Sequence, residues 1–467
     1  MSVLTAGPHT SALLTDMYEL TMLQASLQSG TAHRRSIFEV FGRRLPAGRR
    51  YGVVAGTGRV LELLEDFRFA DEQLHFLAKR RVVGSAALDY LREYRFTGTI
   101  RGYAEGEVYF PGSPLMTVEG TFADAVVLET MILSVLNHDT AVASAASRMA
   151  NAAGGRPLAE MGSRRTHEIA AVAAARAAAV AGFSATSNLE AGMAYGIPTL
   201  GTSAHSFTLV HDTEREAFEA QVASLGRDTT LLLDTYDVDA ALRTAIEVAG
   251  TGLGGVRIDS GDLGIQAAEV RAKLDELGAV ETTITVTSDL DEYAIAALAA
   301  APVDSYGVGT RVVTGSGHPT ANLVYKLVAR AGGSGPGADG TEAGGAEADG
   351  TVAGGTEGAG EPEWVAVAKT ASAKSSRGGR KQALRVLDSG IATEEAIGIP
   401  QLPAELADGR ELLVDLVRNG EIDDAFTGAE GVRRAQERHA ASIAELPRTA
   451  RRLQDGEPAI PTVFYEG

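Results

Sequence analysis

The histidine at position 205 stands in the motif GTSAHSF, directly after a short run that predicts a strand. Its small neighbours Gly201, Ser203 and Ala204 allow a substrate and the backbone to approach it closely. Asp234 ends a later predicted strand and can hold one nitrogen of the imidazole ring. A neutral imidazole held in this way keeps its other nitrogen free as a nucleophile. The motif therefore indicates a reactive histidine, with a structural histidine as the alternative.

A second motif, GVRIDSGDL at residues 255–263, places Arg257, Asp259 and Asp262 around a Ser-Gly turn at the end of a strand. Two acids and an arginine suit a ribose diol, a magnesium-bound pyrophosphate, or both, although one aspartate can also simply cap the next helix. The motif SYGVGT at residues 305–310 adds a glycine turn, which either binds phosphate through backbone N–H groups or only makes a tight turn. The sequence has no Walker-type phosphate loop, so ATP is not expected in one.

The segment EMGSRRTH at residues 160–167 brings Arg164 and Arg165 to the point where a predicted strand becomes a helix. Positive side chains in the first turn of a helix oppose the helix dipole. A bound anion would offset this cost, because helix N-termini and arginine side chains both attract anionic groups. We therefore expect an anion at this pair. Two exposed surface arginines are the alternative.

These residues must be positioned by strands and helices that alternate between residues 156 and 310. The β-rich runs that predict strands are 156–161, 183–186, 198–202, 229–234, 255–259, 283–287 and 304–308. Helix-like segments separate most of them, at 165–181, 238–249, 262–277 and 290–300. Seven short strands with such crossovers predict parallel pairing, in a β/α barrel or a doubly wound sheet.

Residues that can take part in chemistry or bind phosphate follow these predicted strands one after another. They are Ser163 and Arg164, Ser187 and Asn188, His205, Asp234, Asp259 and Ser260, Ser288 and Asp289, and Gly307 with Gly309. In a β/α barrel such positions share the C-terminal rim, where active sites lie. Some of these residues only cap the next helix, but capping does not explain an arginine, a histidine and several acids together.

The first third of the chain predicts a separate domain. Residues 1–150 mix short strands with helices, including a helix at 16–28 and a long linking helix at 124–150. Residues 151–330 then hold the alternating strands and helices of the predicted catalytic domain.

The remaining chain differs in composition. Residues 331–363 hold seven acidic residues and no basic one among many glycines and alanines, which predicts a flexible acidic insertion between strands at 322–329 and 364–369. Residues 364–467 are predicted as a return segment. Its basic stretch at 366–386 suits an anion-binding loop or a solvated face, and residues from 400 onward predict helices and linkers.

The overall composition bounds the class of protein. The chain has 467 residues, 45% of them hydrophobic, which suffices for a large core in two or three domains. The absence of cysteine excludes disulfides and fits a reducing cytoplasm. A formal net charge of −19 argues against nucleic acid as a partner. No apolar run approaches the roughly 20 residues of a membrane helix, and no signal peptide is recognised. We predict a cytoplasmic protein without nucleic-acid or membrane partners.

Together these motifs resemble the nicotinate phosphoribosyltransferase family. The matching stretches span nearly all of residues 10–330 in the family's order and are LLTDMYELTM, FEVFGRRLPAG, EMGSRRTHE, ATSNLEAG, GIPTLGTSAHSF, LLLDTYD, VRIDSGDL, TVTSDLDEY and YGVGTRVVT. Beyond residue 330 the resemblance is confined to WVAVAKTASAKSSRGGRKQALR. The resemblance implies the α/β fold of type II phosphoribosyltransferases: an irregular seven-stranded β/α barrel with an additional α/β domain formed largely by the N-terminal part.

The resemblance also implies roles for single residues. His205 matches the family's phosphorylated histidine, Asp234 its orienting acid, and Arg257 and Asp259 residues around the pyridine ring and the ribose. Arg164 falls at a base-recognition arginine. Apart from the resemblance, we expect Arg165 beside it to contact phosphate. Further expected substrate contacts are Tyr18, which matches an aromatic residue of the neighbouring subunit, Met161, Ser187, Asn188, Ser288, Asp289, Gly307, Gly309, Thr310, Lys369 and Lys374. The position of Met161 is often phenylalanine in the family, so a thioether replaces one wall of the ring sandwich.

The implied reaction joins nicotinate to phosphoribosyl pyrophosphate and couples it to ATP hydrolysis through a phosphohistidine at His205. Magnesium is expected with the two phosphorylated substrates, although its ligands are not identified, and a homodimer is implied. Nicotinamide phosphoribosyltransferase is the alternative enzyme, because it shares the fold and the histidine. A non-catalytic pyridine-nucleotide sensor is the alternative from another class.

Overall fold

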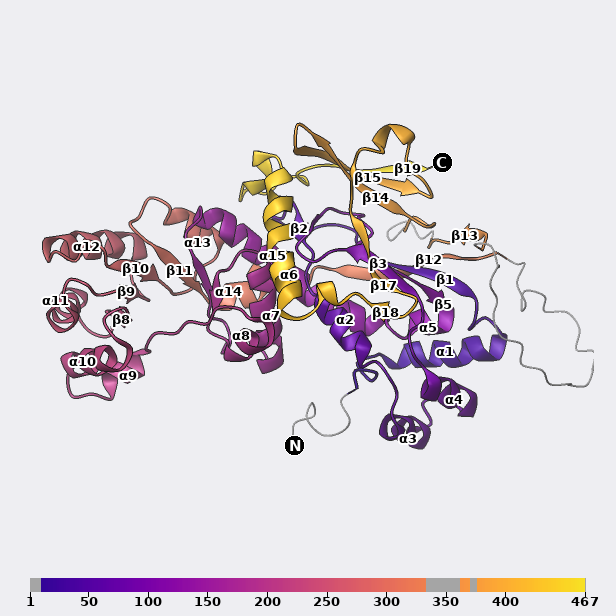
Figure 1. Cartoon of the computed structure of the whole chain (residues 1–467), viewed down its shortest axis with the longest axis horizontal. Coiled ribbons are helices and arrows are strands. Elements are labelled where there is room, and N and C mark those ends of the chain that lie inside the picture. Colours follow the sequence, from indigo (N-terminus) through magenta and orange to yellow (C-terminus); the bar gives the residue numbers. More distant parts are fainter. Residues whose placement is uncertain (1–9, 333–361, 370–375, 467) are drawn as a thin grey trace, which may run out of the picture.

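The computed structural model describes residues 10–332, 362–369 and 376–466. Two units lie side by side, one built on an antiparallel sheet and one on a parallel sheet, as the right and left halves of Figure 1 show. The long helices α6 (Glu129–Ala153) and α15 (Gly428–Glu445) lie between them. Each unit has its own large hydrophobic core.

The antiparallel unit is built on a seven-stranded sheet with the order β13-β12-β1-β5-β3-β17-β18. Its strands are β1 (Arg35–Gly42), β3 (Thr99–Tyr103), β5 (Met116–Thr121), β12 (Leu323–Ala331), β13 (Trp364–Ala366), β17 (Leu413–Arg418) and β18 (Glu421–Ile422). β2 (Gly52–Val53) and β4 (Val108–Tyr109) form a small separate sheet. The N-terminal part supplies only the centre of the large sheet. β12, which the sequence placed with the barrel, instead pairs with β1 along its length.

Helices of this unit share a hydrophobic core with the sheet. They are α1 (Met17–Ser29), α2 (Thr57–Glu65), α3 (Asp71–Arg80), α4 (Ser85–Glu93) and α5 (Phe122–Val126), of which α5 packs directly on β1 and β5. In α1 the predicted apolar positions Leu20 and Leu23 are buried, and Gly30 ends the helix in the left-handed region at φ 76°. The predicted helix at 124–150 is in fact two helices, α5 and α6. Thr121 caps the first by accepting a hydrogen bond from the backbone of Asp124.

The parallel unit carries a six-stranded sheet with the order β7-β6-β11-β10-β9-β8, and every neighbouring pair is parallel. The strands are β6 (Leu158–Glu160), β7 (Ala185–Thr186), β8 (Thr230–Leu232), β9 (Gly255–Ile258), β10 (Thr283–Val286) and β11 (Ser305–Val308). Each of these strands lies within a predicted strand. Short buried runs of β-branched residues between helices favour parallel pairing. The parallel prediction is confirmed.

The seventh predicted strand, 198–202, is reduced to a single parallel bridge between Thr199 and Thr186. Backbone bonds from Thr186 to Pro198 and from Leu200 to Thr186 hold it beside β7. The pairing therefore runs through seven segments, with 198–200 at one end and β8 at the other. Among the described residues no strand pairing joins those two ends.

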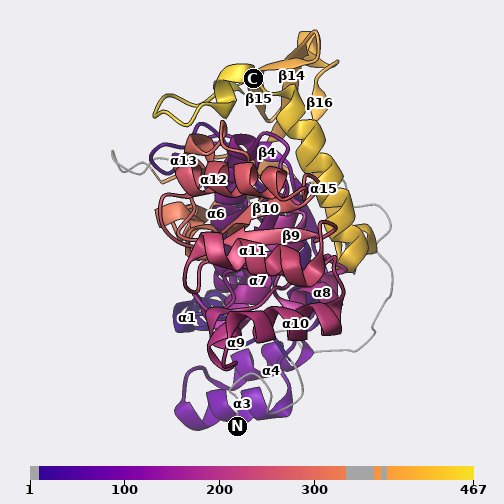
Figure 2. The ribbon, with the colours of Figure 1, turned by 90° about the vertical axis from the view of Figure 1, so that its left-hand side faces the viewer.

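Helices surround the parallel sheet on its outer side, as Figure 2 shows for α10, α11 and α12. They are α7 (Glu168–Val180), α8 (Leu189–Tyr195), α9 (His205–Leu209), α10 (Glu214–Leu225), α11 (Val238–Ala249), α12 (Leu263–Glu276), α13 (Glu292–Ala297) and α14 (Thr310–Val313). Several begin at a side-chain cap from Asn188, Asp237, Asp262 or Asp291. Of the polar residues named after the predicted strands, Asn188 caps a helix with its side chain, and so does Asp262 of the motif GVRIDSGDL, as the alternative interpretation expects.

The C-terminal part differs from its prediction as helices and linkers. It contains a four-stranded sheet with the order β16-β14-β15-β19. Its strands are β14 (Gln382–Asp388), β15 (Ile391–Ile399), β16 (Arg410–Glu411) and β19 (Thr462–Glu466). Short 3-10 turns lie at η1 (Gly315–Gly317), η2 (Ala404–Leu406), η3 (Asp424–Phe426) and η4 (Arg448–Arg451). Polar and apolar residues alternate only weakly along these strands, so the sequence did not predict them.

The hairpin predicted around the acidic segment is present at its base, where Trp364 pairs with Ala331 in the antiparallel ladder of β12 and β13. Most of the acidic segment itself, residues 333–361, lies outside the described residues. Within the described ranges, no helix has the length and apolar character needed to cross a bilayer.

Candidate active site

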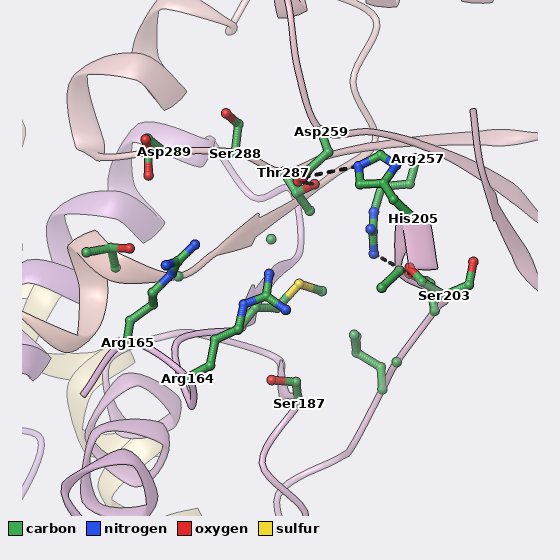
Figure 3. A pocket seen from close by; sticks show the side chains of 18 residues that line it. Arg164, Arg165, Ser187, Ser203, His205, Arg257, Asp259, Thr287, Ser288 and Asp289 are labelled. Carbon is green, nitrogen blue, oxygen red and sulfur yellow. Dashed lines mark hydrogen bonds and ion pairs between the residues drawn. The ribbon is translucent and has the colours of Figure 1, made fainter. Parts of the chain in front are cut away.

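A pocket of about 470 Å³ lies at the C-terminal ends of the parallel strands. Figure 3 shows it with Arg164 and Arg165 on one side and His205 and Arg257 on the other. It gathers most of the predicted site residues, namely Met161, Arg164, Arg165, Ser187, His205, Arg257, Asp259, Ser288, Asp289, Gly307, Gly309 and Thr310. Residues that the sequence did not single out also line it, namely Leu200, Thr202 and Thr287. The C-terminal rim predicted from the strand pattern is thus one continuous site.

His205 is the first residue of α9 and has a half-exposed side chain. Its Nδ1 atom lies 3.2 Å from the hydroxyl of Thr235. Its Nε2 atom lies 3.9 Å from Asp234 Oδ1 and 4.0 Å from Asp259 Oδ2, which is ion-pair range but too long for a hydrogen bond. Asp234 therefore lies near the ring but does not form the expected hydrogen bond with it. Thr235 is the hydrogen-bond partner, and the sequence analysis did not identify it.

Asp234 is buried beneath the pocket rather than lining it. Its Oδ2 atom accepts hydrogen bonds from the backbone of Asp259 at 3.0 Å and from the hydroxyl of Ser260 at 2.6 Å. Its buried Oδ1 atom has no hydrogen-bond partner among the described residues. Asp234 therefore fixes the turn after β9 with one oxygen and faces His205 with the other.

Arg257 lies on β9 and donates a hydrogen bond from Nη1 to the hydroxyl of Thr202. Its Nε atom is buried and has no partner within the described ranges. Burial lowers the pKa of Arg257, with the charge of Arg164 acting in the same direction, while Asp259 and Asp234 oppose the shift. Two guanidinium groups that repel each other across one pocket favour an anion between them.

Arg164 and Arg165 lie in the turn between β6 and α7, where the amide of Arg165 bonds to the carbonyl of Gly162. Helix α7 begins at Glu168 and is capped by His167, so the arginines precede the helix instead of occupying its first turn. The dipole argument for an anion at this pair is therefore wrong as stated. Their place on the wall of the pocket is nevertheless the predicted one.

Turns after β10 and β11 complete the pocket. Ser288 has a φ of 109°, a conformation that side-chain-bearing residues rarely adopt and that is enriched at functional sites. A Cβ atom on Gly307 would lie 2.6 Å from Thr287 Cγ2 and 2.7 Å from Met161 Sδ. A side chain at position 307 would therefore displace the thioether of Met161 or the methyl group of Thr287. Gly309 precedes the short helix α14, whose first residue is Thr310.

The remaining predicted contacts lie elsewhere in the chain. Asn188 is buried, caps α8 through its carbonyl oxygen and donates from Nδ2 to Ser163, so both ends of its amide already have protein partners. Tyr18 lies half-exposed on α1 in the other unit, and Lys369 follows β13. Neither lines the pocket of its own chain. Lys374 lies outside the described residues.

Among the described residues, no group of three or more His, Cys, Asp or Glu side chains is arranged to hold a metal ion. The carboxylates that reach the pocket are Asp259 and Asp289.

Sequence comparison places these motifs in a known family. A model described as the nicotinate phosphoribosyltransferase N-terminal domain matches residues 13–137. The chain is 52% identical over 463 residues to a nicotinate phosphoribosyltransferase of Mycobacterium tuberculosis, which covers 97% of this chain and 95% of that protein. It is 37% identical over 327 residues to a nicotinate phosphoribosyltransferase of Bacillus subtilis, and this match covers 68% of this chain and 66% of that protein.

Comparison of structures agrees on the fold. The crystal structure of human nicotinic acid phosphoribosyltransferase matches with a TM-score of 0.76 and 26% identity, over 97% of both chains. A Pyrococcus furiosus structure described as nicotinate-nucleotide pyrophosphorylase matches with a TM-score of 0.71 and 22% identity, over 95% of this chain and 99% of that one. With half of its residues identical to a relative that it covers almost from end to end, the chain belongs to the nicotinate phosphoribosyltransferase family.

Proposed function

We propose that this protein is a nicotinate phosphoribosyltransferase, which forms nicotinate mononucleotide and pyrophosphate from nicotinate and phosphoribosyl pyrophosphate. The observation that carries the proposal is the pocket itself. One cavity at the ends of parallel strands combines arginines, aspartates, a histidine and a glycine turn. These are the groups needed to bind an anionic ring, a ribose diol and phosphates at once. The names of the relatives point to the same reaction.

Nicotinate would be held by its carboxylate and its ring. Arg164 and Arg257 lie close enough for the charge of one to lower the pKa of the other, so a carboxylate between them relieves their repulsion. Met161 lies over Gly307 beside them and offers a polarizable apolar surface for one face of the pyridine. This arrangement favours an anionic ring substituent over the neutral amide of nicotinamide.

The phosphoribosyl group would lie along the turns after β9, β10 and β11. Ser288 and Asp289 offer a hydroxyl and a carboxylate for the ribose diol, and Gly309 with Thr310 offers backbone and hydroxyl donors for the 5′-phosphate. Arg165 is the candidate contact for the pyrophosphate. We place magnesium with that pyrophosphate, because Mg²⁺ is commonly held by substrate phosphates, waters and one or two carboxylates. Asp259 and Asp289 fit that requirement, and the bound ion would supply positive charge for the leaving group.

The transfer step breaks the bond between ribose C1 and the pyrophosphate oxygen and forms a bond from C1 to the pyridine nitrogen. Positive charge develops on the ribose before the new bond is complete, so a nearby carboxylate lowers the barrier. Asp259 can serve this role, since its Oδ1 atom is oriented by the hydroxyl of Thr287. The electron pair of the broken bond leaves with the pyrophosphate.

We further propose that ATP hydrolysis is coupled to synthesis through His205. A tautomer that donates from Nδ1 to Thr235 leaves the lone pair of Nε2 free to attack the γ-phosphorus of ATP, with ADP leaving. The proton stays on Nδ1, hydrogen-bonded to the hydroxyl of Thr235, so the phosphorylated ring carries a positive charge that Oδ1 of Asp234 can stabilise. Water would later hydrolyse the phosphohistidine and return the neutral ring.

We also propose a homodimer that shares its active sites. Tyr18 is half-exposed near three other exposed apolar side chains, Leu13, Leu14 and Met17, on the unit that does not hold the pocket. An aromatic contact from this surface can reach a pocket only in a second copy, because Tyr18 does not line that of its own chain. We expect the protein to act in the cytoplasm.

The test is a product assay with nicotinate and nicotinamide in parallel, each with and without ATP. We expect nicotinate mononucleotide to form, with ATP hydrolysis stimulated by nicotinate and with little product from nicotinamide. A preference for nicotinamide would support the alternative enzyme. Binding of pyridine nucleotides without turnover of either base would support a sensor and contradict the proposal.

A further inference from the structure

Glu160 is a buried acid directly below the pocket, to which the proposed reaction gives no role. It ends β6, one residue before Met161, and it is only 1% exposed. Burial raises the pKa of Glu160, while its hydrogen bonds act in the opposite direction. An acid is retained at such a position at a cost in stability, unless its oxygens meet well-placed donors.

Both carboxylate oxygens of Glu160 have such donors, and the two donors belong to different segments of the rim. Oε1 accepts a hydrogen bond from the backbone N–H of Gly162. Oε2 accepts one from the hydroxyl of Thr186 at 2.7 Å, and that hydroxyl in turn accepts from the backbone N–H of Asn188 at 3.0 Å. The carboxylate therefore joins the turn after β6 to the turn after β7.

Two further hydrogen bonds join the same two turns. The backbone carbonyl of Glu160 accepts from the N–H of Ser187 at 2.8 Å. The side chain of Asn188 donates to the hydroxyl of Ser163 at 3.0 Å. Gly162 is closely packed, since a Cβ atom there would lie 2.2 Å from Val313 Cγ1. The turn that carries Arg164 and Arg165 is thus held by hydrogen bonds to Glu160 and to the turn after β7, and not by the helix that follows it.

We infer that Glu160 is the positioning residue of the nicotinate end of the pocket, and that it acts by holding the turn of Met161, Arg164 and Arg165 against the turn of Ser187. This inference rests on the proposed function, in which Arg164 binds the carboxylate of nicotinate. Glu160 does not line the pocket and touches no substrate, so it controls the binding of the base without taking part in the chemistry.

A carboxylate suits this place better than an amide. Both neighbours present a hydrogen to Glu160, the amide of Gly162 and the hydroxyl of Thr186. Glutamine offers one acceptor and one donor, so one neighbour must lose its bond or Thr186 must turn its proton away. The hydroxyl is not free to do so without cost, because it already accepts from Asn188 and is buried.

The experiment compares Glu160→Gln and Thr186→Val with wild type and with Thr186→Ser. We expect the first two to raise the nicotinate KM and the calorimetric Kd for nicotinate roughly tenfold, as the loss of one buried hydrogen bond predicts. We expect kcat to change much less, whereas the KM for phosphoribosyl pyrophosphate should rise together with that for nicotinate, because Arg165 lies on the same turn. Thr186→Ser keeps the hydroxyl and should restore the wild-type nicotinate KM.

The matched control is Glu395→Gln, which removes an equally buried carboxylate from the C-terminal sheet, far from the pocket. It should lower the melting temperature and leave the nicotinate KM unchanged. If Glu160→Gln and Thr186→Val follow that pattern, their role is structural only and the inference is overturned. If Glu160→Gln does not fold, the Thr186→Val and Thr186→Ser pair decides in the same way. An inactive wild-type protein would instead contradict the proposed function itself.

Discussion

The charged groups of the pocket and those of the core between the sheets are paired very differently. In the core, Glu395 accepts hydrogen bonds from Tyr103 at 2.8 Å and from Arg385 at 2.9 Å, and Lys381 contacts Glu39 at 2.7 Å. In the pocket, His205 stays 3.9 Å or more from both carboxylates that face it. Buried atoms without a hydrogen-bond partner occur in both sets within the described part of the chain, Asp234 Oδ1 and Arg257 Nε at the pocket and Arg385 Nε and Nη1 in the core, so the difference lies in the distance between opposite charges.

The difference in pairing depends on whether the protein itself or a bound ligand supplies the opposite charge. A charge removed from water must be paired by the protein, because its desolvation cost is otherwise too large. A charged group at the rim can keep an oxygen or nitrogen atom without a partner, since a ligand or a reacting group can supply the missing partner. We therefore expect changes in the pocket to act on kinetics and changes in the core to act on stability.

The largest expected effect is that of His205→Ala. The imidazole is the nucleophile in the proposed ATP step, so its removal should abolish nicotinate-stimulated ATP hydrolysis and acid-labile phosphorylation. The melting temperature should stay near that of wild type, because the ring is half-exposed. Labelling with γ-labelled ATP and a thermal melt measure the two quantities. Label on the variant at the wild-type level would rule out His205 as the phosphorylated residue.

Substitution of the two neighbouring arginines should separate base binding from phosphate binding. A hydrogen bond to a charged group contributes about 1.5–3 kcal/mol, so Arg164→Ala should raise the nicotinate KM roughly 10- to 150-fold. Any weak use of nicotinamide should suffer much less, because the amide carries no charge. Arg165→Ala should instead raise the KM for phosphoribosyl pyrophosphate. If Arg164→Ala changed both bases equally or neither, Arg257 would become the better candidate for the carboxylate.

The sequence predicted more of the residues that form the pocket than of the contacts that form the core. His205, Asp259 and Ser288 each follow a short strand in a recognisable motif, and parallel strands bring their C-terminal ends to one rim whatever their order. The pair of Lys381 and Glu39 instead joins residues 342 positions apart, and no local pattern reveals such a contact.

The misses have the same physical origin. Thr235 and Thr202 were overlooked because a threonine after a strand is ordinary, and only the fold shows that they hold His205 and Arg257. The strands after residue 400 were missed because they complete sheets begun elsewhere, as β17 does beside β3. Local propensity is a weak guide where tertiary pairing decides the structure.

In the core, the clearest stability effect should come from His439 of α15. Its Nε2 atom lies 2.9 Å from the hydroxyl of Ser147, and burial lowers its pKa to about 4. The unfolded chain takes up a proton near pH 6.5 and the folded protein only near pH 4, so stability is full above pH 6.5 and is lost as the pH falls between these values. From pH 7 to pH 5 the loss is about 2 kcal/mol.

Urea unfolding of wild type and His439→Gln over this pH range isolates that contribution, since other groups titrate in both proteins. The wild-type stability should fall more steeply toward pH 5 than that of the variant. At pH 7.5 the nicotinate KM should be the same in both. Parallel curves would show that His439 already binds a proton in the folded protein.

The smallest expected effect is that of deleting residues 334–360. The two ends of this acidic segment are already joined, because the amide of Gly332 bonds to the carbonyl of Glu363 at 2.8 Å and Ala331 pairs with Trp364. A short turn can therefore replace the segment without moving β12 or β13, and loop-closure entropy changes only slowly with length. We expect the melting temperature, kcat and both KM values to remain close to those of wild type. A large drop in melting temperature would show that the segment packs on the folded protein, and a change confined to kcat would show that it acts on the pocket. Either result would break the division proposed here, in which the charges that matter are those of the rim and of the buried core.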